Sequence, residues 1–153
     1  MTLPYFDKLK AQLSGEEGDR SKVYDDANGK PIVPGTAVQG HPTIGIGRAL
    51  DVEGLFPDEI DYLFGNNVTR ICAALDQHLA WWRTLSDPRQ AVLIDMAFNM
   101  GVDGLLGWPH TLAMIQAGQY AQAAQSMRDS LWETQVHQRA DRLANQMETG
   151  AWQ

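Results

Sequence analysis

The segment between Ser86 and Gly101 constrains the fold more than any other, because it is apolar around nearly its whole circumference. Ser86 or Asp87 can cap a helix that carries Pro88 in its first turn, and Gly101 ends the apolar run. The apolar side chains between these points are Ala91, Val92, Leu93, Ile94, Met96, Ala97 and Phe98. A helix that is apolar on every side is stable only when other elements cover it. The pattern therefore predicts a buried central helix.

Apolar residues at helical spacing predict the helices around it. A first helix is expected over residues 4–14, and a longer one over residues 57–80 can connect two lobes. Shorter helices are expected over residues 109–118, 120–132 and 136–150. Four of the five tryptophans are expected to be packing residues, namely Trp81, Trp82, Trp132 and Trp152.

Residues 22–47 have a different composition and residue pattern, typical of strands and turns. KVYDD is strand-like, TIGIGR alternates glycine with other residues, and the loop NGKPIVPGTAVQGHP between them is rich in proline and glycine. The fold class that follows is α+β. We expect a small β-hairpin lobe over residues 15–56, a linking helix over 57–80, and an all-helical C-terminal lobe over 81–153. The helix over 4–14 is expected to pack with this C-terminal lobe. Together they form a single domain of residues 1–153.

Charge and composition argue against several classes of protein. Twelve basic and nineteen acidic residues give a net charge of −7, which argues against a nucleic-acid partner. The apolar runs are far shorter than the roughly 20 residues that span a bilayer, so membrane insertion is not expected. The first residues lack the basic start and apolar stretch of a secretory signal, so we expect synthesis in the cytoplasm.

Neither a metal nor another cofactor is expected. Cys72 is the single cysteine of the chain, which rules out an internal disulfide and favours a core position. The histidines lack the spacing of metal ligands; they are His41, His78, His110 and His137.

Five carboxylates lie within EEGDRSKVYDD, residues 16–26. Alternation along a strand puts Asp26 on one face with Tyr24, and Thr43 shares a face with two glycines of the returning segment. Glu17 would stand near that face if the hairpin folds back onto the first helix. A carboxylic acid and a carboxylate that flank a groove can hydrolyse a glycosidic bond. On composition alone, a solvated acidic surface is favoured over a catalytic pair, because acids near helix ends and turns are common.

Five motifs in order carry a family resemblance: EG, VYDDANG, TIGIGR, MAFNMG and TGAW. Together they resemble the phage lysozymes of glycoside hydrolase family twenty-four, from the first helix to Trp152. The resemblance implies a lysozyme-like fold and a muramidase, which cleaves the β-1,4 bond between N-acetylmuramic acid and N-acetylglucosamine in peptidoglycan and causes lysis. It implies a monomer whose partner is the glycan strand.

The resemblance also implies roles for individual residues. Glu17 matches the general acid, Asp26 the second carboxylate, and Thr43 the threonine that helps to hold the attacking water. Tyr24 lines the same region, and an inverting outcome is favoured, with intramolecular transglycosylation as the alternative. The positions of the family's substrate contacts are Gly47, Ala49, Phe98, Thr111 and Ser126, with Asn99 nearby.

Two arginines near the C-terminus match family arginines that pair with acids beside the catalytic one. Arg139 is therefore predicted to pair with Glu17, and Arg142 with Glu16. The remaining acids of the stretch, Asp19 and Asp25, are expected to be solvated charges.

The chain departs from the T-even type of the family at two places near these residues. KPIVPGTAVQGHP, residues 30–42, is inserted where that type has a tight hairpin. This insertion is either an inert surface excursion or a lid that shapes substrate choice. Arg48 and Asn67 stand where that type has a histidine and an acid, so we expect the corresponding ion pair to be absent.

The biological setting stays open at this stage. A phage or prophage enzyme would need a holin or lysis to reach the periplasmic wall, whereas an antibacterial effector would use a secretion machine for the same chemistry. A wall-binding domain without turnover is the third possibility, kept open by the acidic charge and the insertion. That charge predicts weak electrostatic steering toward an anionic wall.

Overall fold

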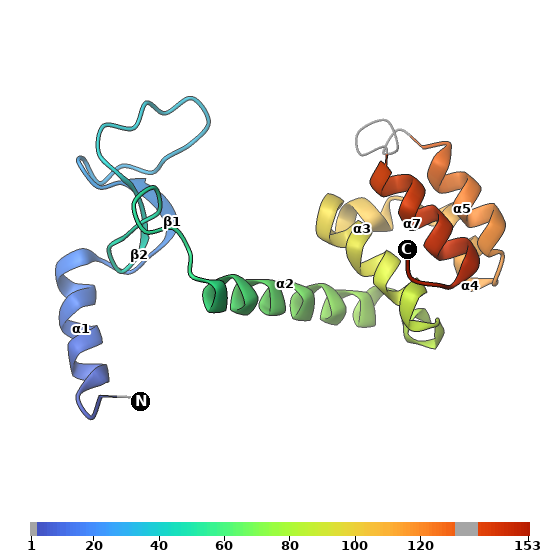
Figure 1. The fold of residues 1–153 in the computed structure, drawn as a ribbon, viewed down its shortest axis with the longest axis horizontal. Coiled ribbons are helices and arrows are strands. Elements are labelled where there is room, and N and C mark those ends of the chain that lie inside the picture. The colour runs from blue at the N-terminus through green and yellow to red at the C-terminus, as the bar shows by residue number, and fades with distance from the viewer. Residues whose placement is uncertain (1–2, 131–137) are drawn as a thin grey trace. The chain divides into compact units, whose positions relative to one another are not determined.

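The computed structural model describes residues 3–130 and 138–153, and the chain forms two compact units, Met1–Ile60 and Asp61–Gln153. The first unit holds all the strands described, and the second consists of helices (Figure 1). This is the α+β architecture expected from the sequence. The assignment of residues 4–14 to the helical lobe stays a prediction.

The first unit begins with a helix and continues into an antiparallel sheet. Helix α1 spans Phe6–Glu17, so it runs three residues beyond the predicted end and carries Glu17 as its last residue. Strands β1 (Arg20–Asp25), β2 (Pro42–Gly45) and β3 (Arg48–Ala49) follow in the order β1-β2-β3. The sheet confirms the hairpin predicted over residues 22–47.

The register of this sheet brings three candidate residues together. Tyr24 of β1 lies opposite Thr43 of β2, and Thr43 lies opposite Ala49 of β3. The β1 register is irregular between Arg20 and Tyr24, so simple alternation does not hold along the strand. Asp26 follows the last residue of β1.

The insertion, residues 30–42, is attached to β1 at its start. Pro31 forms an isolated antiparallel bridge with Tyr24, and the Ile32 N–H donates to the Val23 carbonyl at 3.1 Å. A turn follows in which the Thr36 N–H donates to the Val33 carbonyl at 2.9 Å. The start of the insertion therefore extends the sheet for a few residues before the chain turns back.

Arg48 forms an ion pair that the sequence did not predict. Its guanidinium makes a two-pronged contact with Glu59 in the first turn of α2 (Pro57–His78), with Nη2 to Oε1 at 3.1 Å and Nη1 to Oε2 at 3.2 Å. Its Nε also lies 3.3 Å from Glu53 Oε2. The expectation concerned a pair with position 67, whereas the long arginine reaches an acid in the first turn of the helix. Asn67, which stands at the position of the family's acid, accepts a hydrogen bond at Oδ1 from Arg70 Nη1 at 3.4 Å.

The second unit is organised around the predicted central helix, α3 (Asp87–Leu106). Leu93 and Val92 are 0% exposed, and α3 has non-helical backbone at Gly101, where the apolar run was predicted to end. The other elements of this unit are α2 from residue 61 onward, a short 3₁₀ helix Trp82–Thr84, α4 (Pro109–Gln116), α5 (Tyr120–Arg128) and α7 (Gln138–Thr149).

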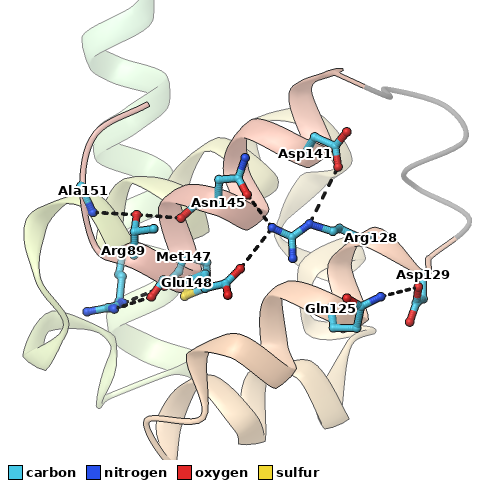
Figure 2. Close-up of polar contacts among 10 residues, drawn as sticks. Arg89, Gln125, Arg128, Asp129, Asp141, Asn145, Met147, Glu148 and Ala151 are labelled. Carbon is cyan, nitrogen blue, oxygen red and sulfur yellow. Dashed lines mark hydrogen bonds and ion pairs between the residues drawn. The ribbon is translucent and has the colours of Figure 1, made fainter.

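Two arginines fasten helix α7 (Figure 2). Arg128 of α5 donates from Nη2 to Asn145 Oδ1 at 2.6 Å and to Glu148 Oε2 at 3.2 Å. Arg89 of α3 donates to the carbonyls of Met147 and Glu148 at 2.8 and 3.0 Å. Cations at the C-terminal end of a helix donate hydrogen bonds to its last carbonyls and interact favourably with the negative end of its dipole.

The tryptophans divide between core and surface. Trp82 is buried and donates from Nε1 to Asp76 Oδ1 at 2.8 Å, and Trp81 packs partly buried against the same core. Trp152 lies beyond α7 and is 67% exposed, so its prediction as a packing residue is wrong. The chain leaves α7 at Gly150 with a positive φ of 69°, and Trp152 lies past that end. Trp132 and His137 lie outside the described residues.

Among the described residues, no single helix has the length and apolar composition to cross a membrane. Helices α3 and α4 reach that composition only as a pair bent by 107°.

Candidate active site

Glu17 lies against the turn that follows β2. A Cβ atom placed on Gly47 would stand 3.0 Å from Glu17 Oε2 and 3.3 Å from its Cγ and Cδ. Gly47 also has a φ of +70°, which disfavours any residue with a side chain. The segment that follows β2 therefore lies against the end of α1, which is the condition under which the sequence placed Glu17 near this face. The close approach of the Glu17 carboxyl to bare backbone explains why a glycine stands at position 47.

Thr43 is buried in the middle of the sheet. It is 3% exposed, and its Oγ1 donates to the carbonyl of His41 at 3.1 Å. Its register partner Tyr24 is also buried, with the Arg20 guanidinium 4.1 Å from the centre of its ring. A hydroxyl that donates one hydrogen bond still has acceptor lone pairs. Thr43 can therefore accept a bond from a water while its own hydrogen is held by the backbone.

Asp26 is exposed, and it forms two hydrogen bonds with the backbone of His41. Asp26 Oδ1 accepts the His41 N–H at 2.6 Å, and the Asp26 N–H donates to the His41 carbonyl at 3.2 Å. That carbonyl also accepts the Thr43 hydroxyl. The backbone of His41 therefore connects Asp26 to Thr43.

Asp25 is the largest departure from the sequence prediction. It is 1% exposed and accepts four hydrogen bonds, from the N–H groups of Gln39, Gly40 and Ala27 at 2.8, 3.0 and 3.1 Å and from Asn28 Nδ2 at 3.0 Å. The Gln39 N–H does most to hold the pKa of Asp25 below its ordinary value, against the opposing effect of burial. The expectation of a solvated charge is wrong, because the returning insertion folds over the carboxylate.

The His41 side chain forms a pair that the sequence reading missed. Its Nδ1 lies 3.0 Å from Asp51 Oδ2 and 3.2 Å from Oδ1. The hydrogen bond and the charge of Asp51 raise the pKa of His41, and the charge of Asp26 acts in the same direction. The same hydrogen bond lowers the pKa of Asp51. The only signal for this pair was a histidine at the end of the insertion with an acid ten residues later.

Two predicted substrate contacts meet in the helical unit. Thr111 Oγ1 lies 2.8 Å from Ser126 Oγ. Both line a cavity of about 880 Å³ between α4 and α5, which is also lined by Met100, Trp108, His110 and Gln125. Two further residues of this set lie at the end of the first segment of α3: Phe98 is 46% exposed with its ring 6.0 Å from that of Phe64, and Asn99 is exposed beside it.

Arg139 and Arg142 share an acid within the helical unit. Arg139 donates from Nε to Asp95 Oδ1 at 2.7 Å, and Arg142 Nη2 lies 3.9 Å from Asp95 Oδ2. The sequence reading did not identify Asp95. Glu16 accepts from Gln12 of the same helix at 3.3 Å. The predicted pairs of Arg139 with Glu17 and of Arg142 with Glu16 stay predictions.

Within residues 3–130 and 138–153, no group of three or more histidine, cysteine, aspartate or glutamate side chains could hold a metal ion.

The fold and these residues together define the class of protein. A helix ends in a glutamate whose carboxyl lies against a glycine that follows the second strand of a small antiparallel sheet. This sheet holds a buried threonine, and a separate helical unit surrounds a central apolar helix. This is a lysozyme-like α+β protein. The family model described as "Phage lysozyme" matches residues 14–148, so the chain belongs to the phage lysozyme family.

Individual relatives agree with this family. "Probable T4-type lysozyme 2" of Dictyostelium discoideum is 30% identical, over 93% of this chain and 94% of that protein. "Probable T4-type lysozyme 1" of the same organism is 33% identical, over 45% of this chain and 41% of its own length. The pre-baseplate central spike protein Gp5 of Enterobacteria phage T4 is 28% identical, over 93% of this chain. The chain spans only 28% of the length of Gp5.

Proposed function

We propose that this protein is a muramidase that hydrolyses the β-1,4 bond between N-acetylmuramic acid and N-acetylglucosamine in peptidoglycan and thereby lyses bacterial cells. Membership of the phage lysozyme family supports the proposal. The observation that carries it is the packing of the Glu17 carboxyl on Gly47, in the segment that also holds Thr43. Asp26 belongs to the same unit.

In the proposed mechanism, the two carboxyl groups act on opposite sides of the scissile bond. Glu17 protonates the leaving glycosidic oxygen. Asp26 accepts a proton from a water molecule, and Thr43 orients that water through the lone pairs that its bond to the His41 carbonyl leaves available. Direct attack of water on the anomeric carbon inverts its configuration.

Each unit, taken by itself, carries residues that are proposed to contact sugar rings of the glycan. Gly47 and Ala49 lie in the first unit, where the glycine leaves backbone open to a sugar ring. Phe98, Asn99, Thr111 and Ser126 lie in the second. The cavity lined by Thr111 and Ser126, about 880 Å³, falls in the size range of small-molecule sites. Its hydroxyl pair suits the amide and hydroxyl groups of an N-acetyl sugar.

The protein is proposed to act as a monomer on the periplasmic wall after synthesis in the cytoplasm, with a holin or lysis as the means of release. An antibacterial effector with the same chemistry differs only in its route to the wall. The genes that neighbour the coding sequence distinguish these two settings.

Product analysis tests the proposed reaction. Purified protein is incubated with peptidoglycan, and the new chain ends are reduced with borohydride and identified by mass spectrometry. We expect reduced N-acetylmuramic acid ends. Reduced N-acetylglucosamine ends would contradict the proposed bond, and 1,6-anhydro products would replace hydrolysis with transglycosylation. The anomer first released, observed by NMR, tests inversion.

A further inference from the structure

The end of the insertion places three consecutive N–H groups on two carboxylates. The Gln39 and Gly40 N–H groups donate to the two oxygens of Asp25, at 2.8 and 3.0 Å. The next N–H, that of His41, donates to Asp26 Oδ1 at 2.6 Å. Hydrogen bonds from N–H groups to ionised carboxylates are among the stronger ones in proteins. Residues 39–41 therefore have a built contact with the proposed second carboxylate.

Gly40 shows how tightly this segment fits against Asp26. A Cβ atom on Gly40 would overlap Asp26 Oδ1 and would lie 2.8 Å from both the Ala27 nitrogen and the Ala27 Cβ. The φ of Gly40 lies outside the left-handed range, so backbone conformation does not require a glycine there. The requirement is one of space. The Asp26 carboxylate occupies the volume where any side chain at position 40 would start.

Asp25 accepts the hydrogen bonds of the other two N–H groups of this segment, those of Gln39 and Gly40. Its four donors satisfy a buried carboxylate, which would be costly to bury without them. An asparagine of the same shape cannot replace it, because its NH₂ group would face N–H groups that need an acceptor. The ionised form of Asp25 is therefore needed to keep the end of the insertion in place.

We propose that Gln39–His41 is a clamp that positions Asp26 and Thr43 for the reaction, with Asp25 as its buried anchor. The proposal rests on the proposed function and deepens it. Asp25 and His41 are positioning residues, since they act through Asp26 and Thr43. The His41 backbone is bonded to both groups proposed to hold the attacking water, and its ring is bonded to Asp51. The insertion is then neither an inert excursion nor a lid.

Gly40→Ala tests the clamp by moving the Asp26 carboxylate. A displacement of about 1 Å can cost on the order of 100-fold in rate. We expect kcat on soluble peptidoglycan fragments to fall roughly 10- to 100-fold, with KM changed by less than about threefold. Gly65→Ala is the matched control, because a Cβ at that helical position meets no atom within 4 Å. Its kcat should equal that of the wild type.

Hydrogen exchange tests the same clamp without reference to activity. The amides of Gln39, Gly40 and His41 should be protected in the wild-type protein, although they lie in a loop. Asp25→Asn should remove that protection for Gln39 and Gly40 and should lower kcat more than it raises KM. Leu93→Ala, a destabilised variant with an intact clamp, should keep the protection and the KM.

Two results would overturn the clamp: a Gly40→Ala protein with wild-type kcat, or unprotected amides at residues 39–41 in the wild type. An inactive wild type with protected amides would instead contradict the proposed function, while the hydrogen bonds of the clamp would stand.

Discussion

The two units bury different kinds of side chain. In the helical unit, apolar residues of α2, α3, α4, α5 and α7 form one continuous core. Among the described residues of the first unit, the buried side chains are Tyr24, Asp25 and Thr43. Two of these three are polar, and both are held by hydrogen bonds to the insertion or to its last residues. A cavity should therefore destabilise the helical unit most, whereas a misplaced polar group should destabilise the first unit most.

The strongest test of the apolar half of this comparison is Leu93→Ala. Leu93 is fully buried in the middle of α3, so the cavity should lower the free energy of unfolding by about 3 to 5 kcal/mol. Leu93→Met, which nearly conserves volume, should cost less than about 1.5 kcal/mol. Urea denaturation measures both. Turnover per folded molecule should not change, and a loss below about 1 kcal/mol for Leu93→Ala would contradict a tightly packed core.

The counterpart in the first unit is Gly47→Ala. A side chain there must adopt a positive φ, at a cost of roughly 1 to 2 kcal/mol, and must also displace the Glu17 carboxyl. Gly45→Ala is the matched control, because Gly45 has a φ of 66° and its Cβ would meet no atom within 4 Å. Both variants should lose similar stability in thermal unfolding. Turnover should fall much further for Gly47→Ala, and equal turnover would contradict the contact with Glu17.

The same contrast explains what could be predicted from the sequence. The central helix and the interruption at Gly101 follow from apolar periodicity, which depends on residues within a few positions of each other. The burial of Asp25 depends on N–H groups 14 and 15 residues further along. Backbone donors in a loop leave no mark on composition, so no local pattern distinguishes this acid from Asp19.

The partner of Arg48 was missed for a different reason. The family resemblance directed attention to position 67, whereas the contact is with Glu59 in the first turn of α2. Among the site residues, Glu17 could be placed near the face of Thr43 and its glycines only on the condition that the hairpin folds back onto the first helix, and the structure shows its carboxyl against Gly47. The roles of Glu17, Asp26 and Thr43 came from the motifs, since composition alone did not separate a catalytic pair from an acidic surface.

The Arg48–Glu59 pair should contribute a smaller, measurable stability. The arginine side chain is 26% exposed and the contact is two-pronged, so Arg48→Ala should cost about 1 kcal/mol. Arg48→Lys should recover little of this, because an ammonium cannot reproduce the fork. A double-mutant cycle with Glu59→Gln isolates the pair. A coupling energy of zero would show that the contact adds no stability.

The His41–Asp51 pair predicts a pH effect confined to the first unit. The pKa of His41 is raised above its ordinary 6.5 by its bond to Asp51, so the charged pair is complete below pH 6.5. Its contribution should be lost as pH rises through the raised pKa. Amide exchange at His41, corrected for the intrinsic pH dependence, should then increase. Asp51→Asn should abolish this step, and an unchanged step in that variant would assign it to another group.

The smallest expected effect is that of salt on turnover. A net charge of −7 gives little long-range attraction to an anionic wall, so added salt should change the rate only weakly. Initial rates at a series of NaCl concentrations measure this. A steep loss with salt would point instead to a local basic surface that steers binding.

The central claim is that Glu17 acts as the acid in a working muramidase site. Its most direct test is the rate at which reducing ends are released from peptidoglycan by the wild type and by Glu17→Gln, compared at equal amounts of folded protein. We expect the wild type to be active and the variant to lose at least about 100-fold in rate with its unfolding midpoint nearly unchanged. An active Glu17→Gln, or a wild type that binds peptidoglycan and releases no ends, would contradict the account.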